Sequence, residues 1–463
     1  MLTYDLEHRG GLARYDYLYR CIKEDILSGR LTAGERLPSK RALAHHLEIG
    51  VVTVETAYAQ LTAEGYLRPE EKRGYFVNAV ETRPSLSPVP EAIPEPPGRE
   101  RPWLLDLTSG GSGTEGFPFS VWARLMRRVL TEQGEDLLRA MPHSGVPELR
   151  RAIARQVYQF RGISADPEQI VIGAGTEYLY NLIVQLLGRE AVYGLEDPGY
   201  SKADQIYALN GARRVFVPVD RHGVLPEMAE QSGAQVLHLS PNHQFPTGAV
   251  IPITRRQQLL RWAAGAEGRY LIEDDYDSEF RFTGRPIPTL QSIDRAHRVI
   301  YMNTFSRSLA PSLRISYMVL PPTLLETYRR RLGFYSCTVP AMEQYTLARF
   351  LDEGRFEAHV NRMRLFYRAQ RDAVLDAIRS SPLGGRCQVM CEDAGLHFLL
   401  RLETGREDGE FSRLARERNI RLSFLSDFQQ TPGAAPPHIL VVNYPGVDLA
   451  HLSRGMELLA ELL

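Results

Sequence analysis

Lysine is nearly absent from this chain of 463 residues. Its 55 lysine and arginine residues include only four lysines, at positions 23, 40, 72 and 202, and all the others are arginine. Lysine is the side chain that forms Schiff bases with carbonyl compounds, whereas a guanidinium stays protonated at physiological pH. Amine chemistry by a side chain is therefore restricted to very few positions.

Cysteine is also scarce, and long apolar runs are missing. The four cysteines, Cys21, Cys337, Cys387 and Cys391, are too few and too scattered for a disulfide framework, and the last two lack the spacing of a zinc site. We therefore expect a cytoplasmic protein without a bound metal. No apolar stretch approaches the roughly 18 residues of a membrane span, and residues 1–10 lack a signal-peptide pattern, so no membrane partner is expected.

An excess of positive charge is missing as well. The formal net charge is −1 and the pI is about 6.9, so any contact with DNA must come from a local patch. The composition is that of a soluble globular protein, and the length fits roughly two to four domains. Prolines recur between positions 84 and 97 without a periodic apolar pattern. We expect a small domain at 1–78, a proline-rich linker at 79–102 and a large domain at 103–463.

The small domain has the pattern of three helices followed by two short strands. Apolar residues recur at helical spacing from Leu18 to Leu27, Ser39 is suited to cap a second helix, and a third helix is expected from about Thr53 to Gly65. Alternating segments at 66–68 and 75–77 predict a hairpin. This combination predicts a winged helix-turn-helix, and a small helical dimerisation module is the alternative.

Four segments of the small domain resemble the winged helix of GntR-type bacterial regulators: ILSGRL at 26–31, GERLPSKRALA at 34–44, TVETAYAQL at 53–61 and EGYL at 64–67. The resemblance implies binding to a double-stranded DNA operator. The residues expected to contact DNA lie near the starts of the second and third helices and at the wing. They are Arg36, Ser39, Lys40, Arg41, Thr53, Thr56, Lys72 and Arg73.

The expected recognition helix departs from the GntR pattern. The family's Ser-Arg-Asn-Thr run, whose arginine reads base edges, is replaced by GVVT at 50–53. We therefore expect readout by Arg41, the two threonines and the wing, or contact of Val51 and Val52 with thymine methyl groups. A scaffold that no longer binds DNA is the alternative.

The large domain alternates strand-like apolar runs with helical stretches. Strands are expected at 170–172, 191–193, 236–239, 270–272 and 299–302. This alternation predicts an α/β domain with a mostly parallel sheet. A strongly helical segment follows at 343–380, and then a C-terminal α+β subdomain with strands near 396–400 and 440–442.

Motifs throughout the large domain resemble fold-type I aminotransferases. They are LEDPGY at 195–200, PNHQFPTG at 241–248, EDDYDSEF at 273–280, NTFSRSLAPSLR at 303–314, HVNRMR at 359–364 and GLHF at 395–398. With the small domain, they make nearly the whole chain similar to MocR/GabR-type regulators. The resemblance implies a homodimer, because fold-type I pockets are built at the subunit interface, and a pocket for pyridoxal 5′-phosphate (PLP).

Carried onto this sequence, the resemblance assigns eight residues to the cofactor. A phosphate cup would consist of Gly175, Thr176, Thr304, Ser306 and Arg314. Tyr200 would stack on the ring, Asp274 would pair with the ring nitrogen, and Tyr276 would bond the phenolic oxygen.

Two positions depart from the aminotransferase pattern. The Schiff-base lysine falls at Arg307, which cannot form an aldimine or move a proton, so we expect no catalysis by the usual route. The arginine that grips a substrate carboxylate is expected near Val441, which cannot do so. Three explanations stay open: PLP bound non-covalently with Arg307 as an extra cation, a different anionic metabolite, or Lys202 as the amine. An engineered substitution at 307 is a fourth.

These features predict a dimeric, DNA-binding transcription regulator. Its aminotransferase-like domain is expected to be catalytically inactive and to sense a small anionic ligand, PLP or a related metabolite. The alternative is a PLP-dependent aminotransferase or lyase with an accessory N-terminal domain. A ligand changes the affinity for DNA only if it binds one arrangement of the linked domains more tightly.

Overall fold

The computed structural model describes residues 2–6, 10–80, 103–108, 116–282, 287–392 and 395–463. The chain forms two compact units, Met1–Arg101 and Pro102–Leu463. The expected linker at 79–102 lies outside the described residues apart from its first two positions. Within the described ranges, no helix combines the length and apolar character needed to cross a membrane.

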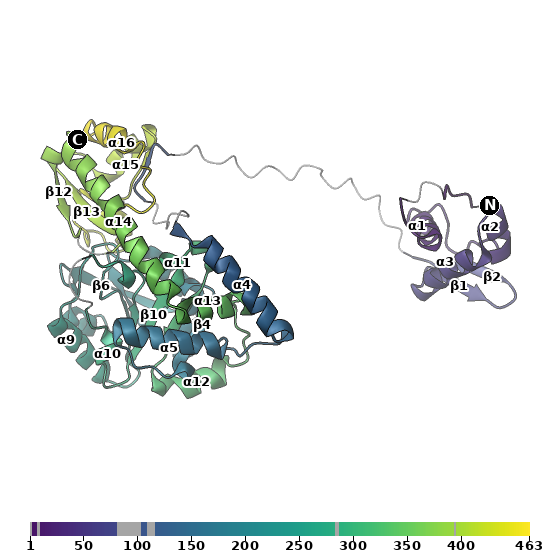
Figure 1. The fold of residues 1–463 in the computed structure, drawn as a ribbon, viewed down its shortest axis with the longest axis horizontal. Helices are drawn as coiled ribbons and strands as arrows, with labels where there is room; N and C mark the ends of the chain where they lie inside the picture. The colour runs from purple at the N-terminus through teal and green to yellow at the C-terminus, as the bar shows by residue number, and fades with distance from the viewer. Residues whose placement is uncertain (1, 7–9, 81–102, 109–115, 283–286, 393–394) are drawn as a thin grey trace. The chain divides into compact units, whose positions relative to one another are not determined.

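The small unit consists of three helices followed by a two-stranded antiparallel sheet (Figure 1). The elements are α1 (Arg14–Leu27), α2 (Lys40–His46), α3 (Val51–Ala63), β1 (Leu67–Glu70) and β2 (Gly74–Val77). The helices and the hairpin share one apolar cluster. This confirms the predicted winged helix-turn-helix.

The start of the third helix is a correction to the sequence analysis. Helix α3 begins at Val51, two residues before the expected Thr53. Gly50 is extended and its carbonyl accepts the amide hydrogen of Thr53 at 3.0 Å, so the helical hydrogen bonds start earlier. The expected cap of the second helix is confirmed, because the Ser39 hydroxyl accepts the amide hydrogen of Ala42 at 3.2 Å.

An eight-stranded sheet forms the centre of the large unit (Figure 1). Its strands, in spatial order, are β4 (Ile170–Gly173), β11 (Ser316–Val319), β10 (Val299–Thr304), β9 (Tyr270–Asp274), β8 (Val236–Leu239), β5 (Val192–Asp197), β6 (Arg213–Asp220) and β7 (Gly223–Val224). Strands β10, β9, β8, β5 and β6 are parallel, and β11 is antiparallel to both of its neighbours. The expected mostly parallel sheet is confirmed.

Helices cover both faces of this sheet. Ile170 and Ile172 pack with residues of α5 and α13, whereas Val171 packs in a second cluster with residues of α6 and α12. The helices of the unit are α4 (Phe119–Gln133), α5 (Pro147–Arg161), α6 (Thr176–Leu187), α7 (Ser201–Leu209), α8 (Pro226–Gln231), α9 (Ile253–Ala264), α10 (Leu290–Ile293), α11 (Phe305–Ser308), α12 (Pro322–Leu332), α13 (Ala341–Asp352), α14 (Arg355–Ser380), α15 (Asp408–Glu417) and α16 (Leu452–Ala460).

The C-terminal part forms a separate α+β layer, as expected. Its antiparallel sheet has the order β12 (Cys387–Met390), β13 (His397–Leu402) and β15 (Ile439–Asn443). A short parallel pair joins β3 (Leu105–Asp106) to β14 (Ile420–Arg421). Helices α14, α15 and α16 share an apolar cluster with these strands.

The strand order determines where polar loop residues gather. Strands β5, β8, β9 and β10 are parallel, so their carboxyl ends lie at one edge of the sheet. The loops or helices that follow them contain Tyr200, Ser240, Tyr276 and Ser306. In open α/β sheets this edge is where ligands bind.

Candidate functional site

A cavity of about 400 Å³ lies at this edge of the sheet. Seven of the eight residues expected to bind the cofactor line it: Thr176, Tyr200, Asp274, Tyr276, Thr304, Ser306 and Arg314. The eighth, Gly175, lies against Arg314, because a Cβ atom added to it would be only 2.4 Å from Nη2 of that guanidinium. Gly175 also has φ +91°, which favours glycine. The structure therefore brings all eight residues together.

One end of the cavity is rich in groups suited to an anion. Thr304 caps α11, with its hydroxyl accepting the amide hydrogen of Ser306 at 3.1 Å, and Ser316 donates to the same hydroxyl at 2.7 Å. The Ser306 hydroxyl is buried and has no hydrogen-bond partner among the described residues. Thr176 begins α6, whose N-terminal amide groups favour negative charge. These donors fit a phosphate group.

One carboxylate, Glu177, already pairs with two cationic side chains of the cavity lining. Glu177 accepts from Nη2 of Arg314 at 2.8 Å and from Nζ of Lys202 at 2.9 Å. These hydrogen bonds and charges, chiefly those of Lys202, lower the pKa of Glu177. An incoming phosphate therefore competes with Glu177 for Arg314.

Replacing Glu177 with glutamine is expected to strengthen phosphate binding by roughly two- to fivefold, since the exposed ion pairs that compete with the ligand are weakened. Calorimetric titration with PLP and with inorganic phosphate measures this gain. Glu190→Gln, at an exposed position outside the cavity lining, is the matched control. An unchanged or weaker affinity would contradict the competition.

The cavity lining also contains a buried carboxylate, Asp274. Tyr180 donates to its Oδ2 atom, and His238 Nε2 lies 3.4 Å from the same oxygen. Tyr207 holds the other nitrogen of His238 at 2.9 Å. The Oδ1 atom of Asp274 is buried without a hydrogen-bond partner in the described part of the chain. Buried oxygens are normally bonded, so this one suits a protonated ring nitrogen of a ligand.

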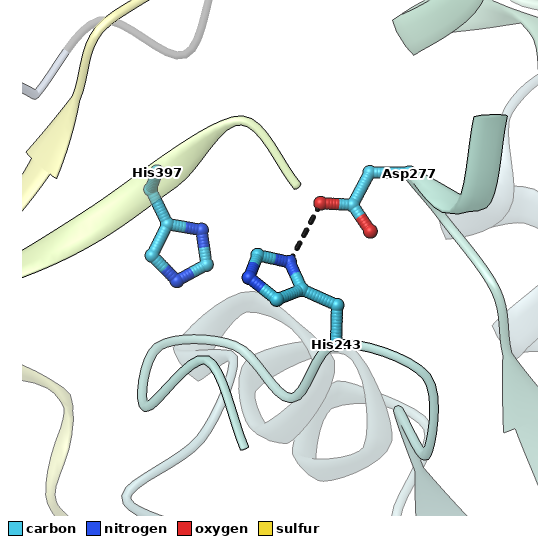
Figure 2. A group of neighbouring side chains, drawn as sticks. All are labelled: His243, Asp277 and His397. Carbon is cyan, nitrogen blue, oxygen red and sulfur yellow. Dashed lines mark hydrogen bonds and ion pairs between the residues drawn. The ribbon is translucent and has the colours of Figure 1, made fainter. Parts of the chain in front are cut away.

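A group of two histidines and an aspartate, in which His243 is hydrogen-bonded to Asp277 and packs against the ring of His397, lies beside Tyr276. The Nδ1 atom of His243 is 2.8 Å from Oδ2 of Asp277 and 3.2 Å from the Tyr276 hydroxyl (Figure 2). A carboxylate only accepts, so Nδ1 carries a hydrogen. Tyr276 can then only accept from that nitrogen, and its own hydrogen is available to a ligand.

The second histidine of the group, His397, faces the ring of His243 in Figure 2. Its Nε2 atom lies 3.1 Å from the carbonyl of Pro246. Burial, and next the charge of His243, lower the pKa of His397 well below its usual range, so this ring is neutral. His243, Asp277 and His397 offer ligand atoms within 4.8 Å of one another, but the bond to Asp277 commits Nδ1 of His243.

Glu196 is a second buried acid in the cavity lining. Its Oε2 atom accepts the amide hydrogen of Ser240 at 3.1 Å, and Oε1 has no hydrogen-bond partner in the described ranges. Burial raises the pKa of Glu196 to about 8. Glu196 is therefore mostly neutral at neutral pH.

The variant Glu196→Gln is expected to gain stability over the natural protein as the pH rises. Because folding raises the pKa of Glu196, this acid contributes stability that is fully present below its ordinary pKa. That contribution is lost as the pH rises through about 8. Glutamine never ionises, so the difference in free energy of unfolding should be small near pH 5 and reach a few kcal/mol near about pH 9. Urea unfolding at both pH values measures it. Equal differences at both would contradict the buried-acid assignment.

The predicted DNA contacts lie on or near α2, α3 and the wing of the small unit. Arg41 is exposed on α2, while Lys40 forms an ion pair with Glu55 of α3. The Thr56 hydroxyl donates to the carbonyl of Val52 at 2.9 Å, and Thr53 is half-buried.

The wing and the start of α3 contain the remaining exposed side chains of this region. Lys72 and Arg73 lie in the turn between the wing strands, and Arg73 pairs with Glu70 at 2.6 Å. Arg36 lies against the wing at Gly74. Val52 is 73% exposed, and Val51 beside it is 42% exposed. Both valines are available to an apolar partner.

Sequence reasoning missed Glu196 and Tyr180, which line the cavity, and Asp277 and His397, which contact His243. Glu196, Asp277 and His397 lie inside the motifs quoted above, but the motifs give no role for them. Tyr180 lies one helical turn after Thr176, a spacing that places both on one face of α6. Val441, at the expected substrate-arginine position, is fully buried in β15 and does not line the cavity.

Comparison with known families agrees with this architecture. Residues 104–450 match the family described as aminotransferase class I and II, and residues 14–77 match bacterial regulatory proteins of the gntR family. The structure is similar to LysN, the alpha-aminoadipate aminotransferase from Thermus thermophilus, complexed with N-(5′-phosphopyridoxyl)-L-leucine. The TM-score is 0.67, with 27% sequence identity, and the match covers 78% of this chain and 92% of that one.

Relatives share both parts of the chain. The uncharacterized HTH-type transcriptional regulator YdeL of Bacillus subtilis (strain 168) is 38% identical over 450 residues, covering 96% of this chain and 95% of that protein. The probable rhizopine catabolism regulatory protein MocR of Rhizobium meliloti is 33% identical over 467 residues, covering 97% and 94%.

A gntR-family winged helix joined to an aminotransferase class I and II domain defines a class of bacterial regulators. The chain belongs to the MocR-type family of HTH transcriptional regulators. This confirms the resemblance drawn from the motifs and the predicted fold class.

Proposed function

We propose that this protein is a DNA-binding transcription regulator that senses PLP, or a closely related phosphorylated metabolite, without forming a covalent bond to residue 307. The observation that carries the proposal is the cavity. It contains hydrogen-bonding groups without partners among the described residues, Ser306 Oγ at the start of α11 and Asp274 Oδ1 at the end of β9. The complex of LysN with a phosphopyridoxyl compound supports this ligand class.

The residues of the cavity fit PLP in three respects. Thr176, Ser306 and Arg314 would hold the phosphate, and Asp274 would keep the ring nitrogen protonated. Tyr276 would donate to the phenolic oxygen. When bound to an amino group, this cofactor stabilises negative charge on the adjacent carbon.

Arg307 is the reason for proposing a sensor rather than an enzyme. It lines the cavity next to Ser306, at the position that the aminotransferase motif gives to the reactive lysine. Its guanidinium remains protonated, so it can bind an anion but cannot accept or deliver a proton at the ligand. The proposed non-enzymatic role rests on this chemistry.

The DNA side of the proposal rests on the winged helix. Two chains of a homodimer would present two copies of α3 to paired half-sites, whose spacing would follow the dimer. The ligand would act by favouring one arrangement of the linked domains, because only a difference in binding shifts an equilibrium. We place this activity in the bacterial cytoplasm.

Two titrations test the proposed function. Adding PLP to the purified protein, followed by absorbance and then by borohydride treatment and mass spectrometry, is expected to show saturable binding without a reduced adduct. Anisotropy of a labelled fragment of the gene's own upstream region is expected to show salt-sensitive binding that PLP alters.

The same measurements separate this proposal from the alternatives. A borohydride-stable adduct on Lys202, which also lines the cavity, together with turnover of an amino donor and a keto acid, would establish the enzyme. DNA binding that salt does not weaken, or no DNA binding at all, would overturn the proposal that this protein is a DNA-binding regulator.

A further inference from the structure

Helix α3 begins with two exposed valines at the positions where a DNA-reading helix meets the bases. In a helix-turn-helix the second helix lies in the major groove, and its N-terminal residues contact the base edges. Helix α3 follows α2 after a short turn, so Val51 and Val52 occupy these positions. Gly50 before them has no side chain that could reach a base. The first side chains that α3 offers to DNA are therefore apolar.

Burial divides α3 into two faces. The face that packs in the core of the small unit consists of Val54, Ala57, Tyr58 and Leu61. The exposed face, at the three- and four-residue spacing of one side of a helix, consists of Val52, Glu55, Thr56 and Ala59. Because the core fixes the rotation of the helix, Val52 is held on the outside of the small unit.

The polar groups of the exposed face are already bonded within the small unit. The Thr56 hydroxyl donates to the carbonyl of Val52 at 2.9 Å. Glu55 accepts from Nζ of Lys40, and a carboxylate has no hydrogen to donate. Ala59 has no polar side-chain atom. These side chains therefore offer no free hydrogen-bond donor to the acceptors that the bases present in the major groove.

The 5-methyl group of thymine is the major-groove feature that an apolar side chain contacts. Positive charge flanks the valines on two elements that contact α3, since Arg41 is exposed on α2 and Lys72 is exposed in the turn of the wing. Such charges suit the phosphates on both sides of a groove. Duplex DNA thus fits the charges and the apolar residues together.

We infer that Val52, with Val51 beside it, selects thymine in each half-site by contacting its 5-methyl group. This contact rests on the proposed DNA-binding function and deepens it by naming a feature of the operator. It assigns the choice of base at this position to the valines rather than to Thr56, whose hydroxyl is bonded to the helix backbone.

Exchange of thymine for uracil in the DNA tests the contact. A labelled fragment of the gene's own upstream region is amplified once with thymidine and once with deoxyuridine triphosphate, so the two products differ only in methyl groups. The full chain is expected to bind the uracil fragment about three- to fourfold more weakly for each methyl group contacted, and about tenfold more weakly for two half-sites. Anisotropy at one salt concentration, with unlabelled alternating dG-dC duplex as competitor, measures both affinities.

Two variants assign the loss to the valines. Val51→Ala combined with Val52→Ala removes the methyl groups that would meet thymine while keeping a good helix former. This double variant should bind the thymine fragment more weakly and bind both fragments within about twofold of each other. Tyr15→Ala, which removes an exposed ring from α1, is the control and should keep the full difference. The ratio of affinities within the natural protein tests the contact even if the double variant does not fold.

The outcomes separate the contact from the proposed function. If neither fragment binds in a salt-sensitive manner, the proposed function is wrong and the contact falls with it. If the natural protein binds both fragments within about twofold of each other, the proposed function stands and the methyl contact is wrong. A difference that persists unchanged in the double variant would overturn the role of the valines.

Discussion

Replacing Arg307 with lysine is expected to turn the protein yellow when PLP is added. Lysine would supply an amine at the position of the reactive residue, in a cavity that already has Asp274 and the phosphate donors in place. The natural protein should show no covalent attachment at residue 307. Visible absorbance, followed by borohydride reduction and peptide mapping to residue 307, measures the difference.

Arg307→Gln is the control for this gain, because it removes the guanidinium without adding an amine. If Arg307→Lys stays colourless while PLP still binds, the ring does not present its carbonyl carbon to residue 307. If PLP fails to bind to both the natural protein and the lysine variant, the cavity has another ligand.

Replacing Arg41 with alanine is expected to weaken binding to the operator by about 1–3 kcal/mol if this arginine contacts a base. If it contacts a phosphate, the loss should be similar for all sequences and the salt dependence should become shallower by about one ion. Arg41 is exposed on α2, next to the capped start of that helix. Anisotropy titrations at several salt concentrations measure both quantities.

Two controls bracket this prediction. Arg20→Ala changes an exposed arginine of α1 that pairs with Asp16, and we expect little effect on DNA binding. Lys40→Ala should cost less than Arg41→Ala, because Lys40 already pairs with Glu55. If Arg41→Ala and the natural protein bind the operator with equal affinity and dimerise equally, this face of the small unit does not contact DNA as predicted.

Much of the fold was predictable because its signals are local. Ser39 caps α2, as its position in the sequence predicted. Five apolar runs that were predicted as strands form strands of the central sheet. Strands β6, β7 and β11 were missed. Strand β6 begins with two arginines and contains Pro218, so its pattern is not that of a buried parallel strand. Strand β11 is only four residues long.

The candidate site was predictable only in its motif residues. Tyr180 and Asp274 lie 94 residues apart in sequence, and Glu177 and Arg314 lie 137 residues apart, so no local pattern pairs them. The competition of Glu177 for Arg314 and the burial of Glu196 follow from packing. Neither can be read from the quoted motifs, which contain Arg314 and Glu196 but not Glu177.

The two-part architecture, the residue types of the cavity and the guanidinium at position 307 all follow from the order of the amino acids. They depend on side-chain identity and short-range periodicity, both of which are visible in the sequence. Three other properties depend on the packing of the folded chain: which oxygens lack partners, which acid is neutral and which cations are already paired. Hydrogen bonding and desolvation depend on groups that the fold brings together from distant parts of the chain, and so they exist only once the chain is folded.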